Sequence, residues 1–323
     1  MTPTRIRWAV SILAILGTLP YITLKVMWLS GSRVGLVDPG FGRSATMHLA
    51  NALTMGMDAT AIALALAFVM PWGRRLPNRL VLLPMWVATG LLAPIVVIVP
   101  LQIVIGAPTP TDPDRVEPIA HWVYEMVYAG FMWQGVFLLT AFTLYAAHRW
   151  GGRWGLPLTD HADRRAAGVV LGLLAVAASG AVLRADDGAA NLIGDLATVA
   201  AAAAGVLLMA TPVHLPRRWP IVLTWLGSGA MAAWGLYTLV LLVVPNDLVG
   251  DRSVPAADIA AQLAWLGAGL AAAWLGVRRL RSDRAADDAA GGSTQASTQA
   301  SAQGSGRMSD GMPAPFWTSP TRS

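Results

Sequence analysis

The sequence predicts an all-α protein, a polytopic transmembrane bundle of about eight helices. Of its 323 residues, 55% are hydrophobic and only 13% are charged, whereas soluble proteins carry about 25% charged residues. The mean hydropathy is +0.54, and long uncharged stretches alternate with short charged ones along the chain. We therefore expect the lipid bilayer to be the main partner of its surface.

Eight stretches have the length of a membrane span, which needs about 20 mostly apolar residues to cross about 30 Å of hydrocarbon. The first of them follows Arg5 and Arg7 but continues past Pro20 without a cleavage site, so we expect a retained helix rather than a secretion signal. The connecting segments are too short to hold a soluble domain. The predicted spans are approximately 8–29, 45–70, 80–105, 119–147, 166–183, 189–210, 219–244 and 257–277.

Basic residues concentrate in every second connecting segment, and such segments face the cytoplasm. The segments between them hold few arginines, mixed with acidic residues. This alternation over eight spans predicts that both termini are cytoplasmic, and the Arg- and Ala-rich composition favours a bacterial plasma membrane. The basic segments contain Arg5, Arg7, Arg74, Arg75, Arg79, Arg149, Arg153, Arg164, Arg165, Arg217, Arg218, Arg278, Arg279, Arg281 and Arg284.

Several classes of function lack the residues they need. The chain has no cysteine, which excludes disulfides, cysteine nucleophiles and cysteine-ligated clusters. The sequence has no Walker phosphate loop, no His-Glu-x-x-His motif and no Gly-x-Ser-x-Gly elbow. The pI near 10.2 follows from arginines at helix ends rather than from nucleic-acid binding. We expect no cofactor, no metal site and no nucleic-acid partner.

The C-terminal segment 282–323 differs from the rest in composition, being rich in Ala, Ser, Gly, Gln and Asp. Such a segment buries too little apolar area to offset the entropy of ordering it. We therefore divide the chain into a transmembrane domain, residues 1–281, and a disordered cytoplasmic tail, residues 282–323.

An internal repeat is suggested by identical residues spaced 139 apart in the second-to-third and sixth-to-seventh spans. A true duplication would give a parallel 4+4 arrangement of two similarly oriented halves, as in some transporters. Because membrane sequences share composition, chance matching remains the alternative. The matched pairs are Met70 with Met209, Leu76-Pro77 with Leu215-Pro216, Arg79 with Arg218, Trp86 with Trp225, and Gly90 with Gly229.

Polar side chains inside the spans mark the candidate site, because a charge in the bilayer needs a partner or water. In the second span His48, Asn51, Met55 and Asp58 are spaced by three or four residues and share one helical face. Asp58 is the deepest of them. It must bind a proton or pair with a cation, and Lys25 is the intramembrane lysine that could provide the pair.

Two further spans carry a polar stripe in the half that we expect to face outward. The first span has Tyr21, Lys25 and Trp28 on one face; the fourth has His121, Glu125, Tyr128 and Met132. Asp195 lies in the outer third of the sixth span. The candidate intramembrane polar site thus comprises Tyr21, Lys25, His48, Asn51, Asp58, His121, Glu125 and Asp195.

Each candidate also has a structural explanation. Lys25 could extend to the outer headgroups, and His48 and His121 could be neutral imidazoles at the interface. Asp58 and Asp195 could be buried protonated acids that hydrogen-bond between helices.

Residues of the first three spans carry a resemblance to known sequences. They are Pro20-Tyr21, Lys25, Trp28, Gly31, Gly35, Asn51, Met57-Asp58 and Trp86. At these positions the chain resembles a group of uncharacterised actinobacterial multi-pass membrane proteins. The resemblance implies a membrane location and brings no activity, cofactor or partner with it.

Three classes of function are consistent with these features. The first is a non-catalytic membrane component or accessory subunit, whose polar residues fix helix packing and whose partner is another membrane protein. The second is a proton-coupled carrier of a small molecule or ion, with an outward-facing cavity lined by the first, second and fourth spans and Asp58 or Glu125 as titrating group. The third is an intramembrane enzyme or electron carrier, with His48 and His121 as haem ligands. We favour the first and keep the carrier as its main alternative.

Overall fold

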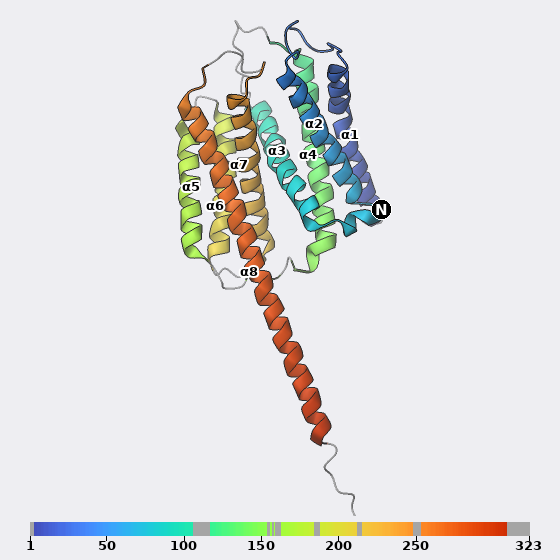
Figure 1. The fold of residues 1–323 in the computed structure, drawn as a ribbon, viewed down its shortest axis with the longest axis vertical. Helices are drawn as coiled ribbons and strands as arrows, with labels where there is room; N and C mark the ends of the chain where they lie inside the picture. Colours follow the sequence, from blue (N-terminus) through green and yellow to red (C-terminus); the bar gives the residue numbers. More distant parts are fainter. Residues whose placement is uncertain are drawn as a thin grey trace, which may run out of the picture. The chain divides into compact units, whose positions relative to one another are not determined.

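The computed structural model describes residues 3–105, 117–153, 156, 158, 163–183, 188–211, 215–247 and 253–308, with side chains described up to residue 285. These residues form eight α-helices and two short 3₁₀-helices, with no strand (Figure 1). All eight α-helices are long and apolar enough to cross a membrane, which confirms the predicted all-α bundle. The helices are α1 Pro3–Leu29, α2 Ala45–Ala67, η1 Pro71–Arg75, α3 Asn78–Ile105, α4 His121–Trp150, η2 Gly151–Arg153, α5 Arg164–Leu183, α6 Ala189–Ala210, α7 Arg218–Val243 and α8 Ala256–Met308.

Several helix ends differ from the prediction. Helix α1 begins at Pro3 instead of residue 8, and α4 ends at Trp150 instead of residue 147. Helix α2 ends at Ala67 instead of residue 70, because Pro71 opens the 3₁₀-helix η1. Helix α8 continues to Met308, past the predicted end of the span at residue 277. The segment expected to be disordered from residue 282 thus has a helical backbone to Met308, in keeping with the helix propensity of its Ala, Gln and Arg residues. Residues 309–323 lie outside the described residues, and the disordered tail stays a prediction.

The chain divides after Val277 into two compact units, and the candidate site lies in the first. Within this unit α3 lies between two groups of helices (Figure 1). Helices α1, α2 and α4 form one group, in which α1 packs on both α2 and α4; helices α5, α6 and α7 form the other, in which α6 packs on both α5 and α7. Helix α3 packs against α4 on one side and against α7 on the other.

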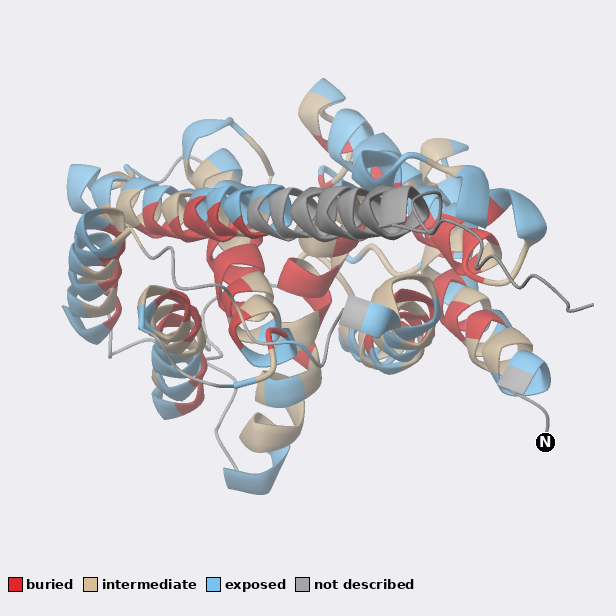
Figure 2. Cartoon of the chain, turned by 90° about the horizontal axis from the view of Figure 1, so that it is seen from below, coloured by how far each residue is buried: buried red, intermediate tan, exposed pale blue. Residues whose placement is uncertain are grey.

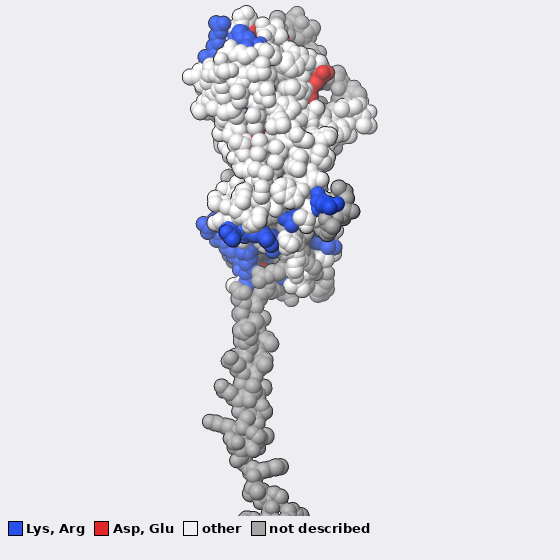
Figure 3. All heavy atoms as spheres, turned by 90° about the vertical axis from the view of Figure 1, so that its right-hand side faces the viewer, with Lys and Arg blue, Asp and Glu red and all other residues white. Residues whose placement is uncertain are grey.

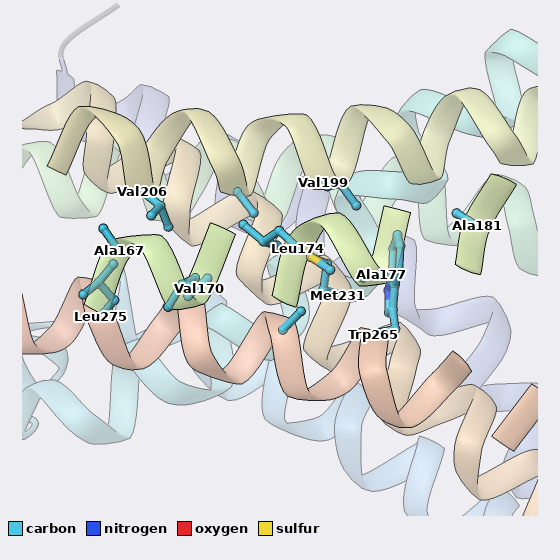
Figure 4. Close-up of a cluster of buried hydrophobic side chains, with 13 residues drawn as sticks. Ala167, Val170, Leu174, Ala177, Ala181, Val199, Val206, Met231, Trp265 and Leu275 are labelled. Atoms are coloured by element: carbon cyan, nitrogen blue, oxygen red, sulfur yellow. The ribbon is translucent and has the colours of Figure 1, made fainter. Parts of the chain in front are cut away.

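The group around α6 has an apolar core in which alanines lie among larger aliphatic side chains and Trp265, and the part of α8 before Val277 joins it (Figure 4). Glycines let the backbones approach closely there, as is typical of helix packing in lipid. A Cβ added to Gly227 of α7 would lie 2.3 Å from the backbone nitrogen of Ala202 of α6. Buried residues face the neighbouring helices, and exposed ones face away (Figure 2).

The crossing of α3 and α7 joins the two groups at Gly90 and Gly229. A Cβ added to Gly90 would lie 2.1 Å from the carbonyl oxygen of Gly229, and the Trp86 indole donates a hydrogen bond to the Ser228 hydroxyl at 3.1 Å. The sequence repeat matches these two glycines with each other. However, α6 packs extensively on α7, whereas α2 touches α3 only slightly, so the duplication stays a prediction.

Charged side chains leave an uncharged belt around the spans. On the face shown in Figure 3, basic side chains gather at one end of the spans, basic and acidic side chains lie toward the other end, and the surface between them carries few charges. Two arginines of the basic segments also hold helix ends together. Arg149 donates to the Leu76 carbonyl at 2.8 Å and Arg7 donates to the Phe68 carbonyl, so both satisfy backbone groups at the turn after α2.

Candidate functional site

A cavity of about 410 Å³ lies between α1, α2 and α4, at the end of the bundle that the sequence predicts to face outward. The segment between α1 and α2 covers one side of it. Its walls combine cationic, aromatic and aliphatic side chains. The lining residues are Tyr21, Lys25, Trp28, Gly31, Ser32, Arg33, Leu36, Phe41, Gly42, Arg43, Met47, His48, Asn51, Ile119, Val123, Tyr124 and Val127.

Lys25 is a buried lining residue of this cavity, with 6% of its surface exposed. Its Nζ donates a hydrogen bond to Asn51 Oδ1 at 2.7 Å and lies 4.5 Å from the Tyr21 ring centroid and 5.0 Å from that of Trp28. An amide oxygen and two aromatic faces are favourable partners for an ammonium group. Lys25 therefore points into the bundle, instead of extending to the headgroups as one of the sequence-based explanations supposed.

Asp58 is also buried, at 5% exposure, but it does not line the cavity. It lies seven residues beyond Asn51 on α2, which is two helical turns or about 10 Å deeper. Gln134 of α4 donates a hydrogen bond to its Oδ1 at 3.4 Å, while its Oδ2 has no hydrogen-bond partner in the described residues. The charges of Lys25 and Asp58 interact electrostatically. Their hydrogen bonds go to Asn51 and Gln134, so the two groups interact without a direct hydrogen bond.

Three contacts between polar side chains of α2 and of a neighbouring helix follow one another along α2, and we call them the polar seam. Asn51, Thr54 and Asp58 supply them from one face of α2, at spacings of three and four residues. The middle contact joins the side chains of Tyr21 and Thr54. In order of depth from the cavity, the polar seam consists of Lys25–Asn51, Tyr21–Thr54 and Gln134–Asp58.

The face of α1 that carries Lys25 and Tyr21 stays polar toward the opposite end. Thr18 and Ser11 follow on it and are fully buried. Thr18 donates back to the Ile15 carbonyl at 2.7 Å, whereas the Ser11 hydroxyl has no hydrogen-bond partner in the described part of the chain. Buried polar groups therefore extend well below the cavity along α1.

Close packing of α1 on α4 explains how Gln134 reaches Asp58. A Cβ added to Gly17 of α1 would lie 3.1 Å from the backbone nitrogen of Gln134, and one added to Gly130 would lie 3.3 Å from the Gly17 carbonyl oxygen. The two glycines let the helix backbones approach each other. The Gln134 amide thereby lies between α1 and α2 rather than in lipid.

The segment 30–44 is fixed over the cavity by hydrogen bonds from several elements. Three glycines in it, Gly31, Gly35 and Gly42, have positive φ angles of 91°, 75° and 82°, a conformation that other residues rarely adopt. Gly35 also has no room for a side chain, since a Cβ would lie 2.4 Å from Val123. The bonds are Trp28 Nε1 to Val34 O at 2.8 Å, Ala120 N to Gly35 O at 2.8 Å, Val37 N to Pro118 O at 2.9 Å, and Gly42 N to Asp247 Oδ2 at 2.9 Å.

The predicted stripe on the fourth span faces away from the cavity. The side chains of His121 and Glu125 are 83% and 68% exposed, and His121 Nε2 lies 3.3 Å from Glu125 Oε1. Tyr128 is exposed as well. The reason is the contact between α1 and α4. The face of α4 that carries Gly130 and Gln134 packs inward, so the face with His121 and Glu125 lies outside.

The remaining candidates separate into two places. Tyr21, His48 and Asn51 line the cavity with Lys25, and His48 Nδ1 lies 3.0 Å from the Ser44 carbonyl oxygen. His48 and His121 do not face a common cavity, which weakens the haem hypothesis. Asp195 is half-buried on α6, in the other helix group.

Sequence reasoning missed four residues of the site. Gln134 and Thr54 are neutral, so the search for charges inside spans passed over them. The signal for Gln134 is a long amide side chain placed between Gly130 and Gly135 in an apolar helix. Arg33 and Arg43 entered only the count of loop charges, although both line the cavity.

Eight apolar helices define a multi-pass membrane protein. Three of them, α1, α2 and α4, enclose the polar seam and a ligand-sized cavity at one end. Comparison of the chain with protein-family models, curated proteins and solved structures finds no match.

Proposed function

We propose that the chain is a bacterial plasma-membrane carrier that takes a small molecule or ion from outside through the cavity between α1, α2 and α4. One observation carries the proposal: the buried Lys25 lines the cavity while a second buried charged group, Asp58, lies about two turns deeper on the polar seam. A charged group inside a span costs free energy. Such groups are therefore rare, and they mark substrate or proton pathways or pair with another polar group. With both termini cytoplasmic, the cavity opens to the outside.

In this proposal Asp58 is the group that couples transport to protons. Its Oδ1 is held by Gln134, and its Oδ2 has no hydrogen-bond partner among the described residues. The unsatisfied oxygen is the position at which a proton can bind. A carboxyl that gains or loses this proton changes the charge beneath Lys25 and hence the electrostatics of the cavity.

The test is gradient-driven uptake by the purified protein in proteoliposomes, assayed over a panel of small organic anions, cations and neutral solutes. Asp58→Asn keeps the shape and the hydrogen bond to Gln134 but cannot titrate, so it should abolish the pH-driven part of uptake. Glu125→Gln is the matched control, because this carboxylate is exposed and faces away from the cavity. Wild-type pH-driven uptake in Asp58→Asn would sink the proton-coupled mechanism.

A second function, a non-catalytic subunit that works with another membrane protein, is favoured by the seam itself. Each of its three contacts joins α2 to a neighbouring helix, as residues that only fix helix packing would. In that case Asp58→Asn should leave both stability and function nearly unchanged. The two proposals are thus separated by the same variant.

A further inference from the structure

We infer that the cavity binds a small organic anion, a carboxylate or phosphate attached to an apolar body, whose charge is met by Lys25, Arg33 and Arg43. This inference deepens the proposed function and rests on it only in treating the cavity as a ligand site. The anion could be a free solute or the headgroup of an outer-leaflet lipid, and both present the same chemistry to the cavity.

The first argument is the sign of the charge around the cavity. Lys25, Arg33 and Arg43 line it, and none of the described lining residues is an Asp or a Glu. Two carboxylates are used by the backbone of the segment 30–44: Asp38 accepts from the Gly40 N–H at 2.8 Å, and Asp247 accepts from the Gly42 N–H at 2.9 Å. A third, Glu117, accepts a hydrogen bond from the hydroxyl of the lining residue Tyr124 at 3.4 Å. A concave site lined by one sign of charge attracts ligands of the opposite sign.

The second argument is the capacity of the cationic groups to donate. An ammonium group has three N–H bonds, and the hydrogen bond of Lys25 to a protein oxygen goes to the neutral amide of Asn51. The Arg33 guanidinium has five N–H bonds and donates to the Asp38 carbonyl. Donors are thus left over on both groups, and those of Lys25 are buried, where a charge-assisted hydrogen bond to an anion is strong.

The third argument is the apolar part of the cavity wall. Val123, Tyr124 and Val127 of α4 line the cavity together with Trp28 and Leu36. A bare inorganic anion would leave this wall in contact with water, whereas an aromatic or aliphatic body would cover it. A volume of about 410 Å³ is at the lower end of the range for small-molecule sites, about 300–1,000 Å³, so the ligand is a small one.

The experiment exploits the fact that Lys25 is the single lysine of the chain. Protein labelled with ¹³Cε-lysine gives one lysine signal in NMR, and that signal belongs to the cavity. The full chain in nanodiscs of phosphatidylcholine is titrated with sodium benzoate, with inorganic phosphate and with benzamide, the neutral counterpart of benzoate. A second sample uses nanodiscs that contain phosphatidylglycerol and no added solute.

A saturable shift of the Lys25 signal with benzoate, larger than those with phosphate and with benzamide, supports a site for an organic anion. A shift with phosphate alone would contradict the apolar part of the inference. If phosphatidylglycerol alone moves the signal and removes the response to benzoate, the anion is a lipid headgroup. The inference is overturned if no anion moves the signal, or if benzamide moves it as far as benzoate does. Because binding is measured at equilibrium, a protein that fails to transport can still pass this test.

Variants test which of the three cationic side chains binds the anion. The readout is the affinity for ¹⁴C-labelled benzoate, measured by equilibrium dialysis. Lys25→Gln should weaken binding roughly tenfold or more, because it removes a buried charge-assisted bond; Arg33→Gln and Arg43→Gln should each weaken it less. His121→Gln, at the same end of the bundle but exposed, is the control and should bind as wild type. Equal affinity in Lys25→Gln and wild type would overturn the assignment, and wild-type affinity in Asp58→Asn would show that binding is separate from proton coupling.

Discussion

At the scale of single residues, the contact between Asp58 and Gln134 is the deepest part of the polar seam. Asp58→Leu removes the carboxyl and leaves the buried Gln134 amide without its partner, so it should destabilise the protein by about 1 kcal/mol. Gln134→Leu should cost at least as much, because it leaves Asp58 with neither oxygen bonded. Thermal unfolding in detergent measures both changes.

The double variant Asp58→Leu/Gln134→Leu tests whether the two side chains act as a pair. With both polar groups replaced, this contact leaves no donor or acceptor unpaired, so the double variant should lose less stability than the sum of the two single variants. Additive losses would mean that each residue contributes through other contacts.

The charged residues of the seam could be predicted from sequence, but not their partners. A helical spacing of three and four residues correctly placed Asn51 and Asp58 on one face of α2, and intramembrane charge singled out Lys25. Which side chain meets which depends on the rotation of one helix against another. That rotation is set by the glycine contacts of α1 with α4, which one sequence does not reveal.

At the scale of elements, the crossing of α3 and α7 depends on Gly90. An alanine there would place its Cβ against the Gly229 carbonyl, a backbone atom that can move only with its helix. Gly90→Ala should therefore destabilise the bundle by about 1–3 kcal/mol, measured by thermal unfolding in detergent.

The control for this prediction is Gly172→Ala on α5. An added Cβ at Gly172 meets no atom within 4 Å, and alanine is the better helix former, so this variant should be as stable as wild type or slightly more stable. A Gly90→Ala protein with wild-type stability would mean that α3 and α7 cross elsewhere.

Helices were predicted well as elements because length and hydropathy identify spans without any knowledge of packing. Their faces were predicted less well. The stripe of His121, Glu125 and Tyr128 has the right spacing to line a cavity but lies on the exposed side of α4. Spacing shows which residues share a face, and only the neighbouring helix decides which face is inside.

At the scale of the whole molecule, the two helix groups differ in chemistry although their sequences partly match. Under the 139-residue offset, Asn51 and Asp58 correspond to Ala190 and Ala197. The polar seam therefore has no counterpart at these positions of α6, whose group packs through an apolar core. If the halves arose by duplication, only the first kept or acquired the polar site.

The arginine alternation predicts the orientation of the whole bundle in the membrane. A reporter fused after Arg284 should be cytoplasmic, and one inserted near Asp114 should be external. Paired alkaline phosphatase and fluorescent-protein fusions measure this, since each is active on one side only. An external reporter after Arg284 would contradict an even number of spans with a cytoplasmic N-terminus.

The central claim is that the cavity between α1, α2 and α4 is a water-filled site open to the outside, and labelling of single cysteines tests it most directly. The chain has no cysteine of its own, so each introduced thiol is the only one. Val127→Cys lines the cavity, and Val136→Cys is its matched control, on the same helix but exposed on the span surface. A thiol reacts with maleimides as the thiolate, which requires water.

In intact cells, a membrane-impermeant maleimide should label Val127→Cys and leave Val136→Cys unlabelled. Excess sodium benzoate should slow the labelling of Val127→Cys if the cavity binds an anion. Labelling of Val127→Cys only after the cells are opened, or equal labelling of the two positions, would contradict an outward-facing aqueous cavity at this site.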